Sequence, residues 1–406
     1  MNIDYQISKK LQNVPEALSI YINQIVYSEK RKGIDIVTLS LGEAFFDIPE
    51  FSFKNIDFVK GYHYSDSLGL PELRKKIMNY YNSKYDAQIK DIDEILISSG
   101  SKAIIFMAMQ AVLNDGDEVL IHEPAWLSYE EQVKLVGASP RFLSYDCKVE
   151  EFPAFFTEKT KLLILNNPNN PAGWIYDSKK LQFIYEECKR RGIYILMDEA
   201  YSDFIGTKDE FISLASIVPD KKGVIIVNSL SKNMGMSGWR IGYVIAEKGI
   251  INNILKLNQH IITCAPTILQ MYLAYYFDDI ISITLPQAKE VVEKRKRIKS
   301  YMNQIGLDYL PGNSTFYFLV NIEENNSSTL DFCLYLLFKY GIATVPGGAY
   351  GKSTEKFVRV GIGAESEERL KLALNTIKTV IKQNSVDAGY VDKKLKDNGF
   401  YKFEEK

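Results

Sequence analysis

The sequence predicts an α/β protein with a large domain, built around a mostly parallel β-sheet flanked by helices, and a smaller α+β domain. Short apolar runs without polar alternation are separated by segments of helical period, which is typical of strands buried on both faces of a sheet. Most of these runs end in a cluster of small or polar residues, and the pattern changes after about residue 285. The length of 406 residues also exceeds one typical core, so two domains are expected.

The large domain is expected to span residues 45–285. Its strands are predicted in six apolar runs, at residues 94–98, 118–122, 161–166, 193–198, 223–228 and 241–246. Between several of them, helical patterns cover residues 102–113, 126–136 and 178–191. Ligands in such sheets bind beyond the carboxyl ends of the strands. The polar clusters that follow the strands should therefore meet at one edge, in a single cleft.

The smaller domain is expected to combine residues 1–44 with residues 286–383. Its later part is predicted to contain a charged helix at 287–302, a strand at 315–320, a helix at 330–340, a loop at 346–351, a strand at 356–361 and a helix at 367–382. The polar tail, residues 384–406, is predicted to be an appendage that is disordered or lies on the surface.

The composition argues against several classes of partner. Lysine and arginine number 49 against 51 acidic residues, which gives a net charge of −2 and no basic stripe for nucleic acid or a membrane surface. The apolar runs are too short to cross a bilayer, and the first residues do not resemble a secretory signal. The four cysteines and three histidines lack metal-ligand spacing. We therefore expect a cytoplasmic protein with reduced thiols and no metal site.

The most informative segment is the loop after the fifth predicted strand. It places Lys232 after two hydroxyl residues, Ser229 and Ser231, with Arg240 eight residues later. An amine held in a short loop can condense with an aldehyde, while hydroxyls and an arginine can bind a phosphate. A surface lysine that follows a strand is the alternative interpretation.

Asp198 ends the predicted strand at residues 193–198. A partly buried carboxylate needs a partner in order to stay ionised, and a protonated pyridine nitrogen would provide one. An acid that caps the following helix is the alternative.

Two further segments could bind anions. Gly100, Ser101 and Lys102 precede a predicted helix, whose free backbone N–H groups favour a phosphate, although an ordinary helix cap would look the same. Arg359 interrupts the apolar strand at residues 356–361, where a guanidinium needs a carboxylate. That carboxylate could belong to a substrate or to a structural salt bridge.

Together these motifs resemble those of the class I and II aminotransferases, which use pyridoxal 5'-phosphate (PLP) and adopt fold type I. The resemblance covers about residues 35 to 380. It rests on S-x-S-K with a later Gly and Arg, on Asp-Glu-Ala-Tyr at 198–201, and on N-P-N-N-P-A-G at 167–173. The family usually has Thr where this chain has Ala172, a departure that leaves Asn170 intact.

The resemblance implies a role for each candidate residue. Lys232 would hold PLP as a Schiff base and, once freed by the substrate amine, would take the α-proton and return it to the cofactor. Asp198 would keep the pyridine ring protonated, and Tyr201 and Asn170 would hydrogen-bond its ring oxygen. The remaining cofactor contacts would come from Gly100, Ser101, Lys102, Trp126, Ser229, Ser231 and Arg240.

The same resemblance implies the substrate contacts and the assembly. Arg359 would bind the substrate α-carboxylate, with Gly42, Trp126 and Asn170 close to the substrate. Trp126 would stack on the pyridine ring, although from the residues alone a core tryptophan is equally possible. The position of Tyr64 matches a tyrosine that reaches the phosphate of the neighbouring subunit, so a homodimer is expected.

The function implied is the transfer of an amino group from an L-amino acid to a 2-oxo acid by a ping-pong mechanism. Two alternatives stay open: a PLP-dependent carbon–sulfur lyase similar to cystathionine β-lyase, and a non-catalytic PLP-binding regulator. The lyase would share every cofactor residue, whereas a regulator would usually add a DNA-binding module that this chain has no spare length to hold. Because no second basic residue can be assigned to the distal acid of a dicarboxylate, neutral or aromatic amino acids are the preferred substrates.

Overall fold

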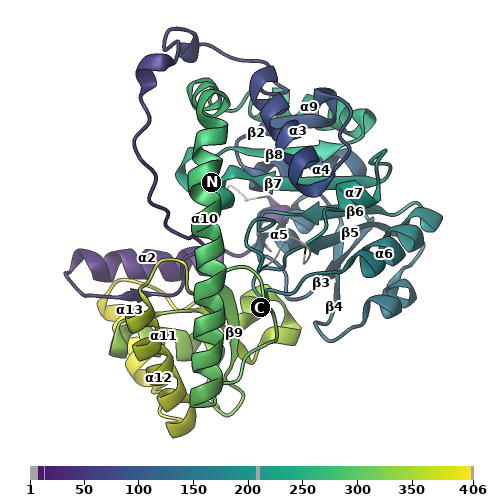
Figure 1. Cartoon of the computed structure of the whole chain (residues 1–406). Helices are drawn as coiled ribbons and strands as arrows, with labels where there is room; N and C mark the ends of the chain where they lie inside the picture. Colours follow the sequence, from purple (N-terminus) through teal and green to yellow (C-terminus); the bar gives the residue numbers. More distant parts are fainter. Residues whose placement is uncertain (1–7, 13, 207–210, 404–406) are drawn as a thin grey trace, which may run out of the picture.

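A computed structural model describes residues 8–12, 14–206 and 211–403 of the chain. Its main feature is a seven-stranded sheet in the order β2-β8-β7-β6-β5-β3-β4 (Figure 1). The strands are β2 (Ile95–Ser98), β3 (Glu118–His122), β4 (Ser139–Leu143), β5 (Thr160–Asn166), β6 (Tyr194–Asp198), β7 (Val224–Ser229) and β8 (Gly242–Ala246). Strands β3 to β7 pair in parallel, and β8 is antiparallel to both of its neighbours. The predicted α/β fold with a mostly parallel sheet is confirmed.

The strands are apolar throughout because both faces of the sheet are buried. On β2, Ile95 and Ile97 belong to one core and Leu96 belongs to the core on the opposite face. Helices α3 (Pro71–Tyr85), α6 (Ser178–Arg191) and α10 (Thr267–Ile305) pack on the first face. Helices α4 (Ser101–Val112), α5 (Ser128–Leu135) and α9 (Lys248–Ile261) pack on the second.

Several elements of this domain were not predicted from the sequence, among them α3, β4 and α9. Strand β4 contains Pro140 and few apolar residues, a composition that a strand tolerates only at the edge of a sheet, where β4 lies. Helix α9 buries Ile250, Ile251 and Ile254 at helical spacing, so its apolar stripe was present in the sequence and was overlooked.

The second part of the structure contains two small sheets. Strands β11 (Val345–Pro346), β12 (Phe357–Gly361) and β9 (Tyr317–Asn321) form an antiparallel sheet in that order. Strand β1 (Val37–Thr38) pairs in parallel with β10 (Ile342–Ala343) and so joins the N-terminal segment to this region. Helices α2 (Leu18–Arg31), α11 (Thr329–Tyr340) and α12 (Glu367–Gln383) bury side chains in the same core. The short helices are α1 (Lys9–Gln12), α7 (Leu214–Ile217) and α8 (Leu230–Asn233).

Helix α10 is 39 residues long and connects the two parts of the molecule (Figure 1). The helix predicted at residues 287–302 is only its second half, and the predicted domain boundary at residue 285 falls inside it. Pro286, the residue before the predicted helix, lies inside α10. The packing on both sides holds the helix together there, because Ile280 is buried in the core of the large sheet and Val292 in the core of the smaller domain.

The C-terminal tail was predicted to be disordered or to lie on the surface, and the structure shows an ordered helix. Helix α13 (Ala388–Asp397) begins at Asp387, whose side chain accepts a hydrogen bond from the backbone N–H of Tyr390. It buries Val391 and Leu395 in the core that α11 and α12 share. The last residues, 404–406, and residues 1–7 and 13 of the predicted small domain lie outside the described residues. In the described part of the chain, no helix has both the length and the apolar character to span a membrane.

Candidate active site

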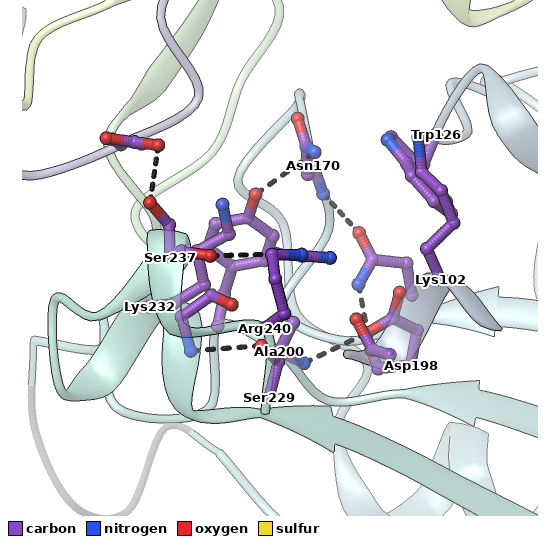
Figure 2. Close-up of a pocket in the computed structure, with 14 residues that line it drawn as sticks. Lys102, Trp126, Asn170, Asp198, Ala200, Ser229, Lys232, Ser237 and Arg240 are labelled. Carbon is purple, nitrogen blue, oxygen red and sulfur yellow. Dashed lines mark hydrogen bonds between the residues drawn. The ribbon is translucent and has the colours of Figure 1, made fainter. Parts of the chain in front are cut away.

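A cavity of about 260 Å³ lies beyond the carboxyl ends of β5, β6 and β7 (Figure 2). Figure 2 shows Lys102 and Trp126 on one side of it and Lys232 and Ser237 on the other. The structure therefore brings most of the predicted residues together, as the convergence of strand ends at one edge requires. The lining residues are Glu43, Ser101, Lys102, Trp126, Asn166, Asn170, Asp198, Ala200, Tyr201, Ser229, Ser231, Lys232, Ser237 and Arg240.

Lys232 lies on the short helix α8, which directly follows β7. Ser229 caps this helix, because its side-chain oxygen accepts a hydrogen bond from the backbone N–H of Ser231 at 3.0 Å. The Lys232 amine donates to the carbonyl oxygen of Gly42 at 2.6 Å. Burial, which disfavours the charged form, lowers the pKa of Lys232 to about 8. Near neutral pH, the neutral and nucleophilic form of this amine is therefore far more populated than it is for a solvent-exposed lysine.

Asp198 ends β6 and faces the same cavity. Its Oδ2 accepts a 2.6 Å hydrogen bond from the phenol of Tyr129, and its Oδ1 accepts one from the backbone N–H of Ala200 at 3.0 Å. Burial raises the pKa of Asp198, while these two hydrogen bonds act in the opposite direction. Among the described residues, no lysine or arginine forms an ion pair with this carboxylate. A cationic nitrogen in the cavity would supply the missing charge.

Tyr201, Asn170 and Tyr317 form a buried polar chain at another wall of the cavity. The side-chain N–H of Asn170 donates to the phenol oxygen of Tyr201 at 3.2 Å, and the Tyr201 and Tyr317 hydroxyls are 3.0 Å apart. The side-chain oxygen Oδ1 of Asn170 is buried and has no hydrogen-bond partner in the described structure. Such an orphaned acceptor marks a place where a ligand group can bind.

The residues predicted to form an anion cradle lie where the loop before α4 meets the start of β8. Gly100 has a φ of +86°, and a Cβ there would lie 2.6 Å from the Nη2 atom of Arg240. A Cβ on Gly242 would lie 2.4 Å from the backbone nitrogen of Ser101. Both glycines therefore permit a close approach that places the guanidinium against the start of α4. Lys102 also faces the cavity, and burial followed by the charge of Arg240 lowers its pKa.

Arg359 lies on β12, next to the cavity but not among the residues that line it. Its Nη2 atom donates to the carbonyl oxygen of Ser40 at 2.6 Å, and its guanidinium lies 4.6 Å from the ring centroid of Tyr317 and 5.2 Å from that of Tyr350. In the described chain, Arg359 forms no ion pair, so the structural salt bridge considered from the sequence is not found. Its Nε is buried without a hydrogen-bond partner. The guanidinium thus keeps donor capacity for an anion.

The other predicted residues differ in their placement. Trp126 is half-buried, lines the cavity, and packs edge-to-face on Tyr129 with ring centroids 5.3 Å apart. Gly42 reaches the site through its carbonyl oxygen, as described above. Tyr64 is 84% exposed and takes no part in the cavity of its own chain.

Sequence reasoning missed several residues at the site, among them Glu43, Tyr129, Ser237 and Tyr317. Ser237 donates a hydrogen bond to the Glu43 carboxylate at 2.6 Å, and this contact joins the N-terminal segment to the loop after α8. Tyr129 and Tyr317 act through partners that are distant in sequence. Only Ser237 carried a usable signal, because it lies inside the motif around Lys232.

Comparisons with known proteins agree with this arrangement. A family model described as "Aminotransferase class I and II" matches residues 37–377. An aspartate aminotransferase of Pyrococcus abyssi is 31% identical over 87% of this chain and 93% of its own length. A (5-formylfuran-3-yl)methyl phosphate transaminase of Methanocaldococcus jannaschii is 32% identical over 92% of this chain and 98% of its own length. A solved structure of Thermus thermophilus aspartate aminotransferase with maleate superposes with a TM-score of 0.85 at 25% identity, covering 93% of this chain and 100% of that chain.

These relatives are aminotransferases, so the comparisons do not favour the carbon–sulfur lyase, and they support an enzyme rather than a non-catalytic regulator. Members of the matched family use PLP as their cofactor. The fold, the amine at the end of β7 and the matches over most of the chain lead to the same conclusion. This chain belongs to the class I and II aminotransferase family and is a PLP-dependent aminotransferase of fold type I.

Proposed function

We propose that Lys232 is the residue that binds PLP covalently and that amino-group transfer takes place in the cavity around it. When bound, the cofactor supplies an electron sink for the bond-breaking step at the substrate α-carbon. The observation that carries the proposal is that the Lys232 amine and the Asp198 carboxylate line one cavity without forming an ion pair with each other. Each group is thus available for the cofactor.

The residues present fit the cofactor at each of its polar ends. Asp198, whose pKa is raised by burial, would be stabilised as a carboxylate by a protonated ring nitrogen. Tyr201 has a phenol O–H, and the side-chain amide of Asn170 has a second N–H besides the one that it donates to Tyr201; both groups would donate to the ring oxygen. Trp126 would cover one face of the ring.

The phosphate would occupy the anion cradle at the start of α4. Gly100 leaves room for the approach of Arg240, and the hydroxyls of Ser101, Ser229 and Ser231 line the same cavity. Arg240 would supply one positive charge. Lys102 would supply a second one, although burial lowers the pKa of its amine. Hydroxyls, backbone N–H groups and two cations together suit a dianion.

Lys232 would act again after the substrate amine displaces it. Its freed amine would take the proton from the substrate α-carbon and return it to the cofactor, as general base and then general acid. A pKa of about 8 suits both tasks near neutral pH, because neither protonation state is rare. The carbonyl oxygen of Gly42 would hold the amine in place between the two transfers.

The substrate α-carboxylate would bind Arg359, whose Nε has no partner in the described structure. The cavity offers little for a second carboxylate, because its basic residues Lys102, Lys232 and Arg240 already have proposed roles. The Glu43 carboxylate also lines the cavity and would repel a distal acid. These observations support neutral or aromatic L-amino acids as donors and 2-oxo acids as acceptors. Aspartate is the alternative donor, favoured by the names of several relatives.

A panel of donors tests the reaction and its substrate class. Phenylalanine, tyrosine, leucine, aspartate and glutamate would each be assayed with 2-oxoglutarate and with pyruvate, while the cofactor absorbance is followed. We expect amino-group transfer, with the highest kcat/KM for a neutral or aromatic donor. A higher kcat/KM for aspartate than for every neutral donor would contradict the substrate class. Release of pyruvate and thiol from cystathionine, with no transfer from any donor, would contradict the reaction.

We also propose a homodimer in which the partner subunit's Tyr64 completes the site. Tyr64 is 84% exposed and lies in a segment with other exposed apolar side chains, among them Phe58, Val59 and Tyr62. A second cavity, of about 400 Å³, lies beside the anion cradle and shares Lys102 and Arg240 with it. A tyrosine from a second copy could reach the phosphate through this cavity. Its remaining lining residues are Ser99, Ala103, Phe106, Gln132 and Leu135.

Subunit complementation tests the shared site. Tyr64→Ala and Lys232→Ala proteins should each have low activity, and mixing them should restore activity in hybrid dimers that contain one complete site. A monomeric mass in light scattering, or no recovery after subunit exchange, would contradict the proposal.

For the location of the enzyme, we propose the cytoplasm. Three of the four cysteines, Cys147, Cys188 and Cys264, are free thiols in the described part of the chain. Reduced thiols are the usual state in that compartment. Fractionation of the source cells with an antibody against this chain would test the proposal, and recovery outside the cytoplasmic fraction would contradict it.

A further inference from the structure

Tyr317 is buried at the junction between the two parts of the fold. It is the first residue of β9 in the small sheet, and none of its surface is exposed. The buried Arg295 of α10 fixes its backbone, because the guanidinium donates to the carbonyl oxygen of Tyr317. Its ring packs edge-to-face on Tyr201, with ring centroids 5.7 Å apart. The position of this phenol is therefore determined by rigid elements rather than by a loop.

The hydroxyl of Tyr317 contacts Tyr201, which is proposed to bind the cofactor, and its ring contacts Arg359, which is proposed to bind the substrate carboxylate. Its hydroxyl lies 3.0 Å from the hydroxyl of Tyr201. The guanidinium of Arg359 lies over its ring, 4.6 Å from the centroid, within the range of a cation–π interaction. A Cβ on Gly42 would lie only 3.3 Å from the Tyr317 hydroxyl, so the segment that holds the Lys232 amine also packs against this phenol.

The direction of the hydrogen bonds follows from the number of protons. A phenol has one proton to donate and can accept from others. Asn170 donates to the Tyr201 oxygen, and Tyr201 has to use its own proton if it is to bond the cofactor ring oxygen. Tyr317 must then donate to Tyr201, since the Tyr201 proton is not available for it. Burial raises the pKa of both phenols, so both keep their protons at neutral pH.

We propose that Tyr317 is a positioning residue that couples the carboxylate site at Arg359 to the cofactor through Tyr201. This inference rests on the function proposed above for Arg359 and Tyr201. A cation over the ring makes the Tyr317 hydroxyl a stronger donor. When a carboxylate binds Arg359, it offsets that charge, weakens the donation to Tyr201 and so weakens the hydrogen bond from Tyr201 to the ring oxygen.

This coupling has a spectroscopic consequence. A hydrogen bond to the ring oxygen stabilises its anion and lowers the pKa of the nitrogen that joins Lys232 to the cofactor. Binding of a carboxylate at Arg359 should therefore raise that pKa, which is measured as the midpoint of the pH titration of the visible absorbance. Occupation of the substrate site would in this way favour the protonated form of the nitrogen that joins Lys232 to the cofactor. A neutral substrate amine would react with that form.

Tyr317→Phe tests the inference because it removes the hydroxyl and keeps the ring under Arg359. The matched control is Tyr309→Phe. The Tyr309 ring packs on Phe318, the residue that follows Tyr317, but the Tyr309 hydroxyl donates to the side-chain oxygen of Asn303, outside the site. In Tyr317→Phe we expect the absorbance midpoint without ligand to rise by roughly half to one pH unit, the range that a hydrogen bond of ordinary strength supports. Addition of maleate or 3-phenylpropanoate should then shift the absorbance midpoint of Tyr317→Phe less than that of the wild type. The control should titrate as the wild type does.

The outcomes separate this inference from the function on which it rests. If the wild-type protein shows no pH-dependent absorbance of a Lys232-bound cofactor, the proposed function itself is wrong. If the wild type titrates and responds to carboxylates, and Tyr317→Phe behaves identically, the function stands and the coupling is wrong. Should Tyr317→Phe fail to fold, Tyr201→Phe removes the other partner of the same bond. An undiminished response to carboxylates in that variant would equally contradict the coupling.

Discussion

The side-chain amine of Lys232 donates a 2.6 Å hydrogen bond to the carbonyl oxygen of Gly42, a residue 190 positions earlier in the chain. This contact joins the end of the large sheet to the N-terminal segment that follows β1. The same segment contacts the site a second time, where Glu43 accepts a hydrogen bond from Ser237. The Lys232 amine is therefore held between two parts of the fold and faces the cavity.

The rate of cofactor capture should depend on pH through the Lys232 amine. Only a neutral amine can attack an aldehyde, and burial lowers the pKa of Lys232 to about 8. We therefore expect the rate at which cofactor-free protein binds PLP to rise as the pH increases and to level off above about 8. Stopped-flow absorbance at a fixed PLP concentration measures this profile. A midpoint near that of a solvent-exposed lysine, about 10.4, would show that the amine is not buried as described.

Gly100→Ala should weaken cofactor binding because the new Cβ would displace Arg240. The added atom would lie 2.6 Å from the guanidinium. Gly116 provides a matched control, since its φ of +87° is nearly the same and a Cβ there meets no atom within 4 Å. Both substitutions should destabilise the fold by about 1–3 kcal/mol through backbone strain at a positive φ. Only Gly100→Ala should also raise the Kd for PLP, measured by absorbance titration, and an equal Kd in both variants would contradict the role of Gly100.

Asp198→Asn should reduce kcat by about 100-fold or more, which corresponds to about 2.7 kcal/mol of lost transition-state stabilisation. The amide keeps the shape and a hydrogen-bond acceptor for Ala200, but it carries no charge to hold the ring nitrogen protonated. Steady-state kinetics and thermal melting would be measured together. Asp220→Asn, at an exposed aspartate, is the control and should leave both unchanged. An active Asp198→Asn enzyme would remove Asp198 from the proposed mechanism.

Arg359→Lys should raise KM for the amino donor more than it lowers kcat. Lysine keeps the positive charge but loses the planar fork that binds a carboxylate through two hydrogen bonds. We expect kcat/KM to fall by about 10- to 100-fold, equivalent to about 1.4–2.7 kcal/mol. Arg141→Lys is the control, because Arg141 also lies on a strand but pairs with Glu118 away from the cavity. An unchanged KM in Arg359→Lys would place the carboxylate site elsewhere.

The part of the site that could be predicted from the sequence is the part formed by strand ends. Asp198 and Lys232 each follow an apolar run, and the carboxyl ends of parallel strands meet at one edge of a sheet. Local motifs were enough to place such residues because a rigid sheet fixes the distances between them. The anion cradle was predictable for the same reason, since Ser101 begins α4 after β2 and Ser229 caps α8 at the end of β7.

The residues that were missed depend on contacts between elements far apart in the chain. Tyr129 is a helix residue, and nothing in its local sequence indicates a hydrogen bond to Asp198, which lies 69 positions later in the chain. Tyr317 reaches Tyr201 only because the segment after β6 packs in the core of the smaller domain. The predicted helix at 287–302 is shorter than α10 because a proline such as Pro286 usually interrupts a helix. Packing on both sides of Pro286 stabilises the longer helix. The role of Tyr64 remains a prediction, since it concerns a second copy of the chain.

Chemical trapping tests the central claim most directly. Borohydride reduction of the PLP-loaded enzyme would convert its nitrogen link to the cofactor into a stable secondary amine, and peptide mass spectrometry would locate it. We expect the cofactor mass on the peptide that contains Lys232 and no trapped cofactor in Lys232→Ala, while Lys222→Ala, at an exposed lysine, traps it normally. Trapping at a different lysine in the wild-type enzyme, or undiminished trapping in Lys232→Ala, would contradict the assignment.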